Sequence, residues 1–344
     1  IEFDDLKNVS NTIDKSIKET ESLLRKENLI SASLKNISRA FISLDLKNGM
    51  IEIDEFAEIR SMLGYYLSLK EYFKGKRFEN WKNKITPIDN PEHILNKINK
   101  VIDNESNVKS NASKELKQIS HSIKQTDTKI ESKMKQELEK YIKLGYLREN
   151  KIIFRSGKTL LPVNTSNKNK VKGVVDSFSA TRQTCFIQPI SLVELNNKLS
   201  ELKSKEKKEI TKILKELTSR LSLDKNLLIS IYNLIKYYDI HTVIACLAIK
   251  LDSVKPEFSE KLILKEAINP LFTLKKKKYV PLDITINNRN SSIVISGPNS
   301  GGKTVVIKSI GLYALMAQCG LYIPSKIAIL PIFKSFLSDI GDKQ

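Results

Sequence analysis

Cysteine and histidine are scarce in this chain of 344 residues, which contains three of each. Cys185, Cys246 and Cys319 lie far apart and form no CxxC pair. A disulfide framework and a thiolate zinc site are therefore not indicated, and the histidines show no spacing that would pair two of them as metal ligands on a helix. A reducing cytosol is the simplest environment for such a chain, so we expect a cytoplasmic protein.

Long apolar runs are also missing. The sequence has no stretch of about twenty apolar residues, and its start, IEFDDLKN, has neither a charged n-region nor an apolar h-region. We therefore expect a soluble protein that is not exported and has no membrane partner. Because the sequence begins at Ile1 and not at a methionine, we also expect a fragment of a longer chain.

Acidic residues are in deficit. Lys and Arg total 58 against 39 Asp and Glu, which gives a net charge of +19. This excess suits a polyanionic partner such as nucleic acid, although a lysine-rich solvated surface would give the same count. The length exceeds the roughly 250 to 300 residues at which single cores stop growing, so we expect more than one domain.

One segment that is present requires a particular ligand. Gly297, Gly302, Lys303 and Thr304 match the pattern of a glycine, four residues, then Gly-Lys and Ser or Thr, which marks a phosphate-binding loop. Its glycines let the backbone approach an anion closely. Lys303 is expected to reach the nucleotide phosphates, and Thr304 to offer its hydroxyl to Mg²⁺. The alternative is a glycine-rich turn that matches by chance.

The flanks of this motif fit the same interpretation. The β-branched run Ile293–Ile295 predicts a buried strand, and apolar residues at helical spacing in Val305–Ala317 predict a helix. A loop at such a junction directs several N–H groups and the positive end of the helix dipole at one spot. The predicted ligands are ATP and Mg²⁺, and the predicted cofactor-binding residues of the loop are Gly297, Pro298, Asn299, Ser300, Gly301, Gly302, Lys303 and Thr304.

Helical periodicity dominates the rest of the chain. Residues 1–74 predict helices with a turn at Asn48-Gly49. Residues 223–251 predict a strongly apolar helix, and Pro256 marks a boundary after it. Two apolar seams, at residues 112–141 and 192–221, have the three- and four-residue steps of a coiled coil. Because the two runs are equally long, we expect an antiparallel pair of helical arms.

Two aromatic residues, Phe78 and Trp81, lie among lysines at residues 74–84. Stacking on nucleic acid and docking onto the helical body both fit this pattern, and docking is favoured.

The residue pattern changes between the two predicted helical arms. Short β-type runs such as TLLPV and TCFIQP alternate with turns at residues 151–189, which predicts a small β module. The module carries seven cations and a single acid, Asp176, so it is the candidate surface for nucleic-acid phosphates; a solvated turn region is the alternative. The candidate nucleic-acid-binding residues are Lys151, Arg155, Lys158, Lys168, Lys170, Lys172 and Arg182.

Several of these segments resemble the MutS family of ATPases, and specifically its second branch, which usually carries an Smr nuclease domain. GPNSGGKTVVIKSIGLYALMAQCGLYIP is similar to the family's phosphate loop and the helix after it, and SDIGDKQ resembles a segment just before the remaining ATPase motifs. VKGVVDSFSATRQTCFIQPISLVELNNKL resembles the branch's clamp, and AINPLF its HPLL element. The sequence departs at Asp176 and Asn269, where the family tends to have His, and at Arg182, where it tends to have Gly.

The resemblance implies a multidomain α+β protein: a mostly helical core and lever with long antiparallel arms, a small β clamp and part of an α/β ABC-type P-loop ATPase domain. The implied domains are a core and lever at residues 1–110, arms at 111–222 with the clamp at about 151–189, a connector at 223–257, and the first half of the ATPase domain at 258–344. By the same resemblance, Tyr279 and Val280 contact the adenine base.

The implied function is that of an ATP-gated homodimeric clamp on branched or structured double-stranded DNA, which restrains recombination. Two alternatives from the same family are a sensor of mismatched DNA and an ATPase that rescues collided ribosomes. A chromosome-organising coiled-coil ATPase would place its phosphate loop before the coiled coil, and here the loop comes after it. A helical adaptor with a vestigial loop is the remaining alternative.

Hydrolysis needs a further motif. An apolar strand ending in Asp-Glu holds the Mg²⁺ hydration shell and polarises the attacking water, and none follows Thr304 in this sequence. We therefore expect ATP hydrolysis, and any nuclease activity, in the full-length parent and not in this chain alone.

Overall fold

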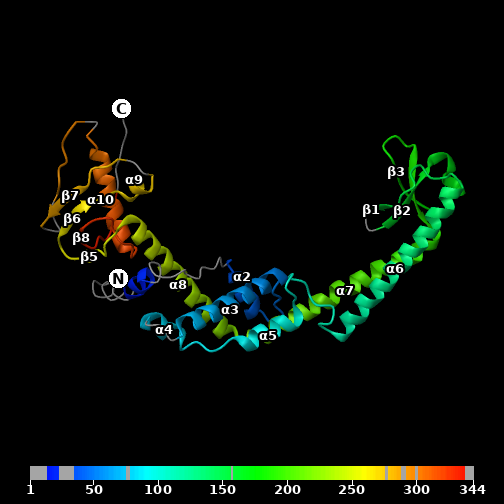
Figure 1. The fold of residues 1–344 in the computed structure, drawn as a ribbon, viewed down its shortest axis with the longest axis horizontal. Helices are drawn as coiled ribbons and strands as arrows, with labels where there is room; N and C mark the ends of the chain where they lie inside the picture. Colours follow the sequence, from blue (N-terminus) through cyan, green and yellow to red (C-terminus); the bar gives the residue numbers. More distant parts are fainter. Residues whose placement is uncertain are drawn as a thin grey trace. The chain divides into compact units, whose positions relative to one another are not determined.

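The structure is a computed structural model that describes residues 14–22, 35–74, 78–155, 158–275, 278–287, 292–298 and 301–337. The predicted loop residues Asn299 and Ser300 and the segment SDIGDKQ lie outside these residues. The chain divides into two compact units (Figure 1). Unit 1 comprises Ile1–Ser33, Gly64–Asn90 and Leu227–Gln344, and unit 2 comprises Leu34–Leu63 and Pro91–Asn226.

Unit 2 contains helices and a small sheet. Its shorter helices are α2 (Ser38–Asp45), the first part of α3 (Ile53–Phe73) and α5 (Glu92–Val101). The predicted turn at Asn48-Gly49 follows α2, and the Gly49 amide donates to the Leu46 carbonyl at 2.9 Å. A Cβ at position 49 would lie 1.8 Å from the Ser43 carbonyl oxygen, so only glycine fits there.

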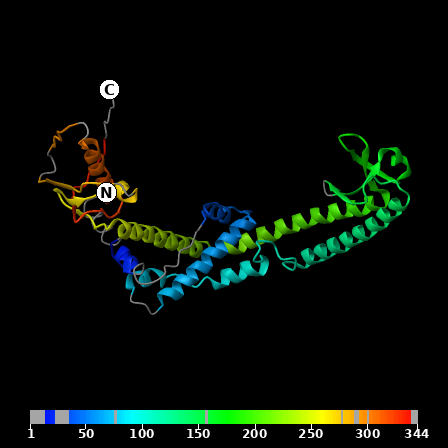
Figure 2. The same ribbon diagram turned by 45° about the horizontal axis from the view of Figure 1, so that its top comes forward.

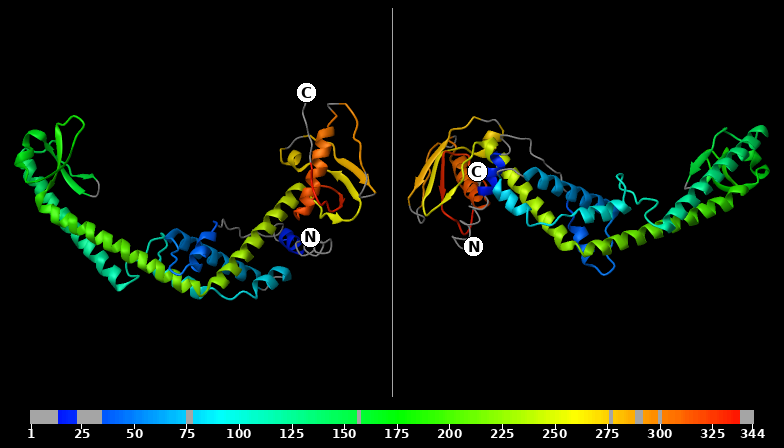
Figure 3. Two further views of the ribbon diagram at one scale, coloured as in Figure 1. Left: turned by 180° about the vertical axis from the view of Figure 1, so that it is seen from behind. Right: turned by 60° about the horizontal axis from the view of Figure 1, so that its bottom comes forward.

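Two long helices, α6 (Lys114–Lys143) and α7 (Ile190–Ser222), lie side by side in every view (Figures 1, 2 and 3). They run antiparallel, because Ser113 at the start of α6 donates to Glu209 at 2.8 Å, whereas Ser191 at the start of α7 donates to Glu137 at 2.7 Å. Buried apolar residues line the contact: Leu116, Ile130 and Met134 from α6, and Leu192, Leu199 and Ile213 from α7. The predicted pair of antiparallel helices is present.

A four-stranded antiparallel sheet joins the two long helices, in the order β1-β2-β4-β3. Its strands are β1 (Ile153–Arg155), β2 (Lys158–Asn164), β3 (Gly173–Phe178) and β4 (Thr184–Pro189), with a 3₁₀ helix, η1 (Thr165–Lys170), between β2 and β3. Val163 pairs with Cys185, and both side chains are buried with Met134, Tyr141 and Leu192 of the helices. This sheet is the predicted β module.

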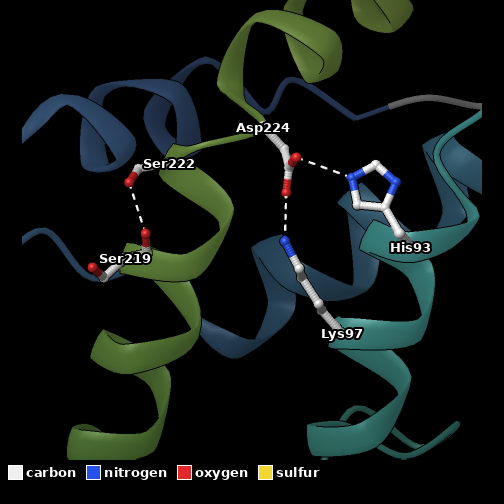
Figure 4. A network of polar contacts seen from close by, with 5 residues as sticks. All are labelled: His93, Lys97, Ser219, Ser222 and Asp224. Carbon is white, nitrogen blue, oxygen red and sulfur yellow. Dashed lines mark hydrogen bonds and ion pairs between the residues drawn. The ribbon is translucent and has the colours of Figure 1, made fainter. Parts of the chain in front are cut away.

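A polar network fixes the turn between α7 and α8 (Lys225–Leu251) (Figure 4). Asp224 accepts hydrogen bonds from Lys97 at 2.8 Å and His93 at 2.9 Å, and both donors lie on α5. Burial alone would raise the pKa of Asp224, but the hydrogen bonds from Lys97 and His93 lower it. The charged carboxylate therefore holds α5 against the end of α7.

An aromatic cluster forms the helical core of unit 1. Trp81 on α4 (Glu79–Ile85) is fully buried; its ring centroid lies 4.9 Å from that of Tyr238 and 6.3 Å from that of Phe73. The indole N–H donates to Thr20 at 3.2 Å, within a helix at residues 14–22. The interpretation of Trp81 as a residue that docks on the helical body is confirmed, since its ring is not accessible for stacking on a base.

The second sheet belongs to unit 1 and has the order β5-β8-β6-β7. Its strands are β5 (Glu257–Phe258), β6 (Leu262–Ala267), β7 (Leu282–Ile286) and β8 (Ile327–Leu330); β5 and β8 are parallel, and the other pairs antiparallel. The short helix α9 (Pro270–Leu274) and the longer α10 (Lys303–Gln318) complete the unit. Tyr313, Ala314 and Ala317 of α10 are buried with Leu264 and Leu330 of this sheet.

The prediction of a buried strand at Ile293–Ile295 is wrong for this structure. The segment is neither helix nor strand, and Ile293 and Val294 are 46% and 92% exposed. A strand requires a neighbour that satisfies its backbone N–H and C=O groups. Within the described residues no strand pairs with this segment, so its β-branched composition alone does not produce one.

No helix in the described part of the chain is long and apolar enough to cross a membrane.

Burial of His241 on α8 predicts a pH dependence of stability. Its Nδ1 lies 2.6 Å from the Tyr237 carbonyl oxygen, and Nε2 is buried without a hydrogen-bond partner among the described residues. Burial lowers the pKa of His241 from its ordinary value of 6.5; the hydrogen bond to Tyr237 opposes this shift, and the nearby charge of Lys84 adds to it.

The folded state therefore holds a neutral imidazole, whereas the unfolded chain binds a proton below pH 6.5. We expect the contribution of His241 to the free energy of unfolding to be fully present above that pH. As the pH falls below 6.5, the free energy of unfolding should decrease. In urea titrations between about pH 7 and pH 5, His241→Asn should flatten this decrease, and His121→Gln, at an exposed position on α6, should not. An unchanged pH profile in His241→Asn would show that another group is responsible.

Candidate functional site

The candidate phosphate loop ends at the first residue of α10. The backbone at Gly302 is left-handed, with φ of 78°, and its carbonyl accepts the first helical hydrogen bond, from Val306, at 3.0 Å. The Gly301 amide donates to the Pro298 carbonyl at 2.9 Å, just before the helix. Glycine at position 302 is required because other residues adopt such a φ only with strain.

Lys303 and Thr304 occupy the first turn of α10. The Lys303 ammonium donates a hydrogen bond to the Gly297 carbonyl, so its side chain lies across the loop. Gly297 has φ of 154°, a conformation that other residues rarely adopt. Thr304 is exposed at the same helix end, where its hydroxyl is accessible to a metal ion.

The arrangement suits an anion. The first N–H groups of a helix have no partner within the helix, and the dipole makes this end positive. No acidic residue lies in the first turn of α10, and Lys303 adds a full positive charge. The described loop residues can therefore hold a phosphate group and, through Thr304, a magnesium ion bound to it.

The cations of the β module divide into two groups. All seven side chains are exposed, but Lys158 pairs with Asp176 at 2.9 Å and Lys151 with Glu149 at 2.5 Å. The Arg155 guanidinium lies 4.1 Å from the centroid of the Phe186 ring. Within the described residues, no ion pair is formed by the remaining five cations: Arg155, Lys168, Lys170, Lys172 and Arg182.

Local structure gathers part of this second group around η1. Lys168 and Lys170 lie on η1, and the Thr165 hydroxyl at its start donates to the Arg182 carbonyl at 2.6 Å. Lys172 directly precedes β3, and its backbone amide donates to the Tyr141 hydroxyl at 3.2 Å. The four cations without an ion pair therefore lie on η1, two residues after it, or in the turn bonded to its start, and a polyanion fits them better than the paired lysines.

Comparison with known proteins supports the resemblance. A family described as MutS domain V matches residues 293–344. Endonuclease MutS2 of Carboxydothermus hydrogenoformans is 35% identical over 337 residues, which cover 95% of this chain and 42% of that protein. The corresponding protein of Ruminiclostridium cellulolyticum is 30% identical over 343 residues, covering 96% and 43%, and that of Halothermothrix orenii is 31% identical over 314 residues, covering 87% and 39%.

The chain belongs to the MutS2 branch of the MutS family. The sequence-based recognition is thereby confirmed. The chain spans about two fifths of the length of these curated MutS2 relatives.

The structure shows what the residues do at two positions that depart from the MutS pattern. Arg182, where the family tends to have Gly, adopts φ of 57°, the left-handed conformation that glycine adopts without strain. Asn269, where the family tends to have His, caps α9: its Oδ1 accepts from the Leu271 amide at 3.0 Å. Its Nδ2 donates to the buried Ser309 hydroxyl on α10 at 2.7 Å. Asn269 therefore ties α9 to the helix that follows the phosphate loop.

The residues proposed to contact adenine lie between α9 and β7. Tyr279 and Val280 are both exposed, at 42% and 92%. Their contact with a base stays a prediction.

Sequence reasoning missed a buried polar contact in the same unit. The Tyr322 hydroxyl donates to Asp14, and Asp14 also pairs with Lys18 at 3.2 Å and Lys255 at 3.4 Å. Burial opposes ionisation of Asp14, but the hydrogen bonds from Tyr322 and Lys18 and the charge of Lys255 lower its pKa. No local pattern predicts this contact, because Asp14 and Tyr322 are 308 positions apart.

Replacement of Asn269 tests the link between α9 and α10. Asn269→Ala removes an N-cap and leaves the buried Ser309 hydroxyl without its donor, so the free energy of unfolding should fall by about 1 to 2 kcal/mol. Asn269→Asp keeps the capping oxygen and loses only the donated hydrogen bond, so its loss in urea denaturation should be smaller. Equal losses in both variants would assign the whole effect to the bond with Ser309.

Proposed function

We propose that this chain is the ATP-binding and nucleic-acid-binding part of a MutS2-type protein. One observation carries the proposal: in the GPNSGGKT motif the left-handed Gly302 is the N-cap of α10, so that Lys303 and Thr304 form the start of the helix. That junction directs backbone N–H groups, the helix dipole and Lys303 at one point, which is what a nucleotide phosphate requires. In this proposal Thr304 holds Mg²⁺, and Tyr279 and Val280 contact the adenine.

The β module is proposed to hold the nucleic acid. Its uncompensated cations and the net charge of +19 support binding to phosphate backbones. Following the MutS pattern, residues 1–110 act as core and lever, 111–222 as arms with the clamp at about 151–189, 223–257 as connector, and 258–344 as the first half of a P-loop ATPase domain. Two such subunits sandwich ATP, and their clamps close on branched or structured DNA, which restrains recombination.

A series of hydrogen bonds links the region after α10 to α4, which supports the proposal of an ATP-gated clamp. Beyond α10, Tyr322 bonds to Asp14 of the helix at residues 14–22. The Glu19 carboxylate of that helix accepts from the backbone amides of Asn80 and Trp81 at 3.0 and 3.1 Å, at the start of α4. A shift of α10 on nucleotide binding would therefore be transmitted to α4 and its aromatic cluster as a rigid-body movement.

Nucleotide binding is tested with Lys303→Ala and a non-hydrolysable ATP analogue with Mg²⁺. Loss of one charge-assisted hydrogen bond should weaken binding about 10- to 100-fold by isothermal titration calorimetry. Lys308→Ala removes an exposed lysine further along α10 and should bind like the unaltered chain. No ATP turnover is expected from this chain alone, because it lacks the Asp-Glu strand.

Absence of analogue binding in the folded chain would favour the helical adaptor. Turnover that Lys303→Ala abolishes would overturn the assignment of hydrolysis to the longer protein.

Nucleic-acid binding is tested with two matched double variants. Lys172→Gln with Arg182→Gln removes uncompensated cations, so the slope of log affinity against log salt for duplex DNA should fall by about 2. Lys151→Gln with Lys158→Gln removes cations already paired with Glu149 and Asp176, so its effect should be smaller. Equal effects would show that binding does not distinguish the two groups.

The preferred substrate is read from the same assay with other ligands. Four-way junctions, mismatched duplexes and stalled ribosomes are compared at one salt concentration. Preference for the junction supports the proposed role in restraining recombination. Preference for a mismatch would instead support a mismatch sensor, and preference for a ribosome an ATPase that rescues collided ribosomes.

A further inference from the structure

A groove between α6 and α7 lies outside the sites described so far. Its volume is about 460 Å³. The α6 side contributes Lys129, Ser132, Lys133 and Gln136, and the α7 side contributes Ser191 and Lys198. Because Lys129 and Lys133 are four residues apart, as are Ser132 and Gln136, each pair projects from the same side of α6. Hydrogen-bond donors from both helices therefore converge on one space.

The charge in this groove is unbalanced. Three lysines meet one acid, Glu194. Elsewhere on the same helices lysines pair with glutamates, as in Lys205 with Glu201 at 2.7 Å and Lys212 with Glu209 at 3.6 Å. In the described part of the chain, by contrast, no ion pair engages the three groove lysines. They are exposed, and among the described residues only Lys198 of the three also interacts electrostatically with a glutamate outside the groove, Glu201. The remaining excess of positive charge favours an anionic ligand.

The lining defines the kind of anion. Lysine ammonium groups bind phosphate as point charges, and the Ser132 hydroxyl and Gln136 amide can donate further hydrogen bonds to its oxygens. Side chains of these types make most contacts to nucleic-acid backbones. The groove has no aromatic residue, so it offers no platform for a base; Leu195 is its one apolar side chain.

The position of the groove connects it to the β module. Ser191 is the second residue of α7, directly after β4, and Lys198 is the ninth, so the groove extends roughly 10 to 12 Å along the helix from the sheet. A backbone held by the module therefore meets these lysines within a few nucleotides, since successive phosphates lie about 3.4 Å apart along one strand of a duplex.

We propose that the groove lined by Lys129, Lys133 and Lys198 binds backbone phosphates of the nucleic acid, next to the contact made by the β module. This site rests on the proposed function and extends it from the sheet onto the helical arms. The arms then bind ligand directly in addition to supporting the module.

The test uses the full chain and duplex DNA. Lys129→Gln, Lys133→Gln and Lys198→Gln together form the groove variant. The control variant, Lys205→Gln with Lys208→Gln and Lys212→Gln, removes the same charge from α7 away from the groove. We expect the groove variant to lower the salt slope by about 3 and the control variant by less than 1. Glu194→Gln, which removes the acid of the groove, should bind more tightly than the unaltered chain.

The outcomes separate this inference from the proposed function. If the unaltered chain binds DNA and the groove and control variants have equal slopes, the groove makes no contact and only the inference is overturned. If the unaltered chain does not bind DNA, the nucleic-acid part of the proposed function fails together with the groove. Groove-dependent binding of inorganic phosphate without an effect on DNA would also overturn the backbone assignment. Circular dichroism of each variant confirms that the exposed substitutions leave the helices intact.

Discussion

The left-handed backbone at Gly302 is the constraint on which the candidate nucleotide site depends. It turns the chain so that α10 begins with Lys303, whose ammonium donates back to the Gly297 carbonyl. The far side of α10 is held by the second sheet, where Tyr313, Ala314 and Ala317 are buried. Packing therefore fixes the helix, and the glycine fixes how the loop meets it. A side chain at position 302 would strain this junction at the place where the ligand is expected.

Contacts between distant segments extend this constraint. Asn269 joins α9 to α10 through Ser309, and Tyr322 joins the region after α10 to Asp14. Both contacts bury polar groups, which is unfavourable unless every group finds a partner. Because the partners are specific, they define how α10 and its neighbours sit within unit 1. Movement of α10 must then either carry these partners along or break their hydrogen bonds.

The sequence predicted the elements whose signal is local. The apolar steps of α6 and α7 repeat over many turns, and the β module is bounded by turn residues, so both were predicted with their order along the chain. The candidate phosphate loop was singled out because its residue spacing is specific to one kind of ligand, and binding of that ligand stays a prediction. The strand expected at Ile293–Ile295 was wrong, since composition does not supply the neighbouring strand that pairing requires. The Asn269–Ser309 and Asp14–Tyr322 contacts could not be predicted from the sequence, because each joins residues that only the tertiary fold brings together.

The burial of Cys185 between the sheet and the ends of the long helices makes the thiols of this chain chemically unequal. Burial raises the pKa of the Cys185 thiol and so disfavours the reactive thiolate, whereas Cys246 and Cys319 are exposed. A thiol-specific dye would therefore attach to the folded chain at the two exposed cysteines of unit 1. Labelling of Cys185 would report the opening of the β module, which gives the chain a built-in spectroscopic reporter for that part of unit 2.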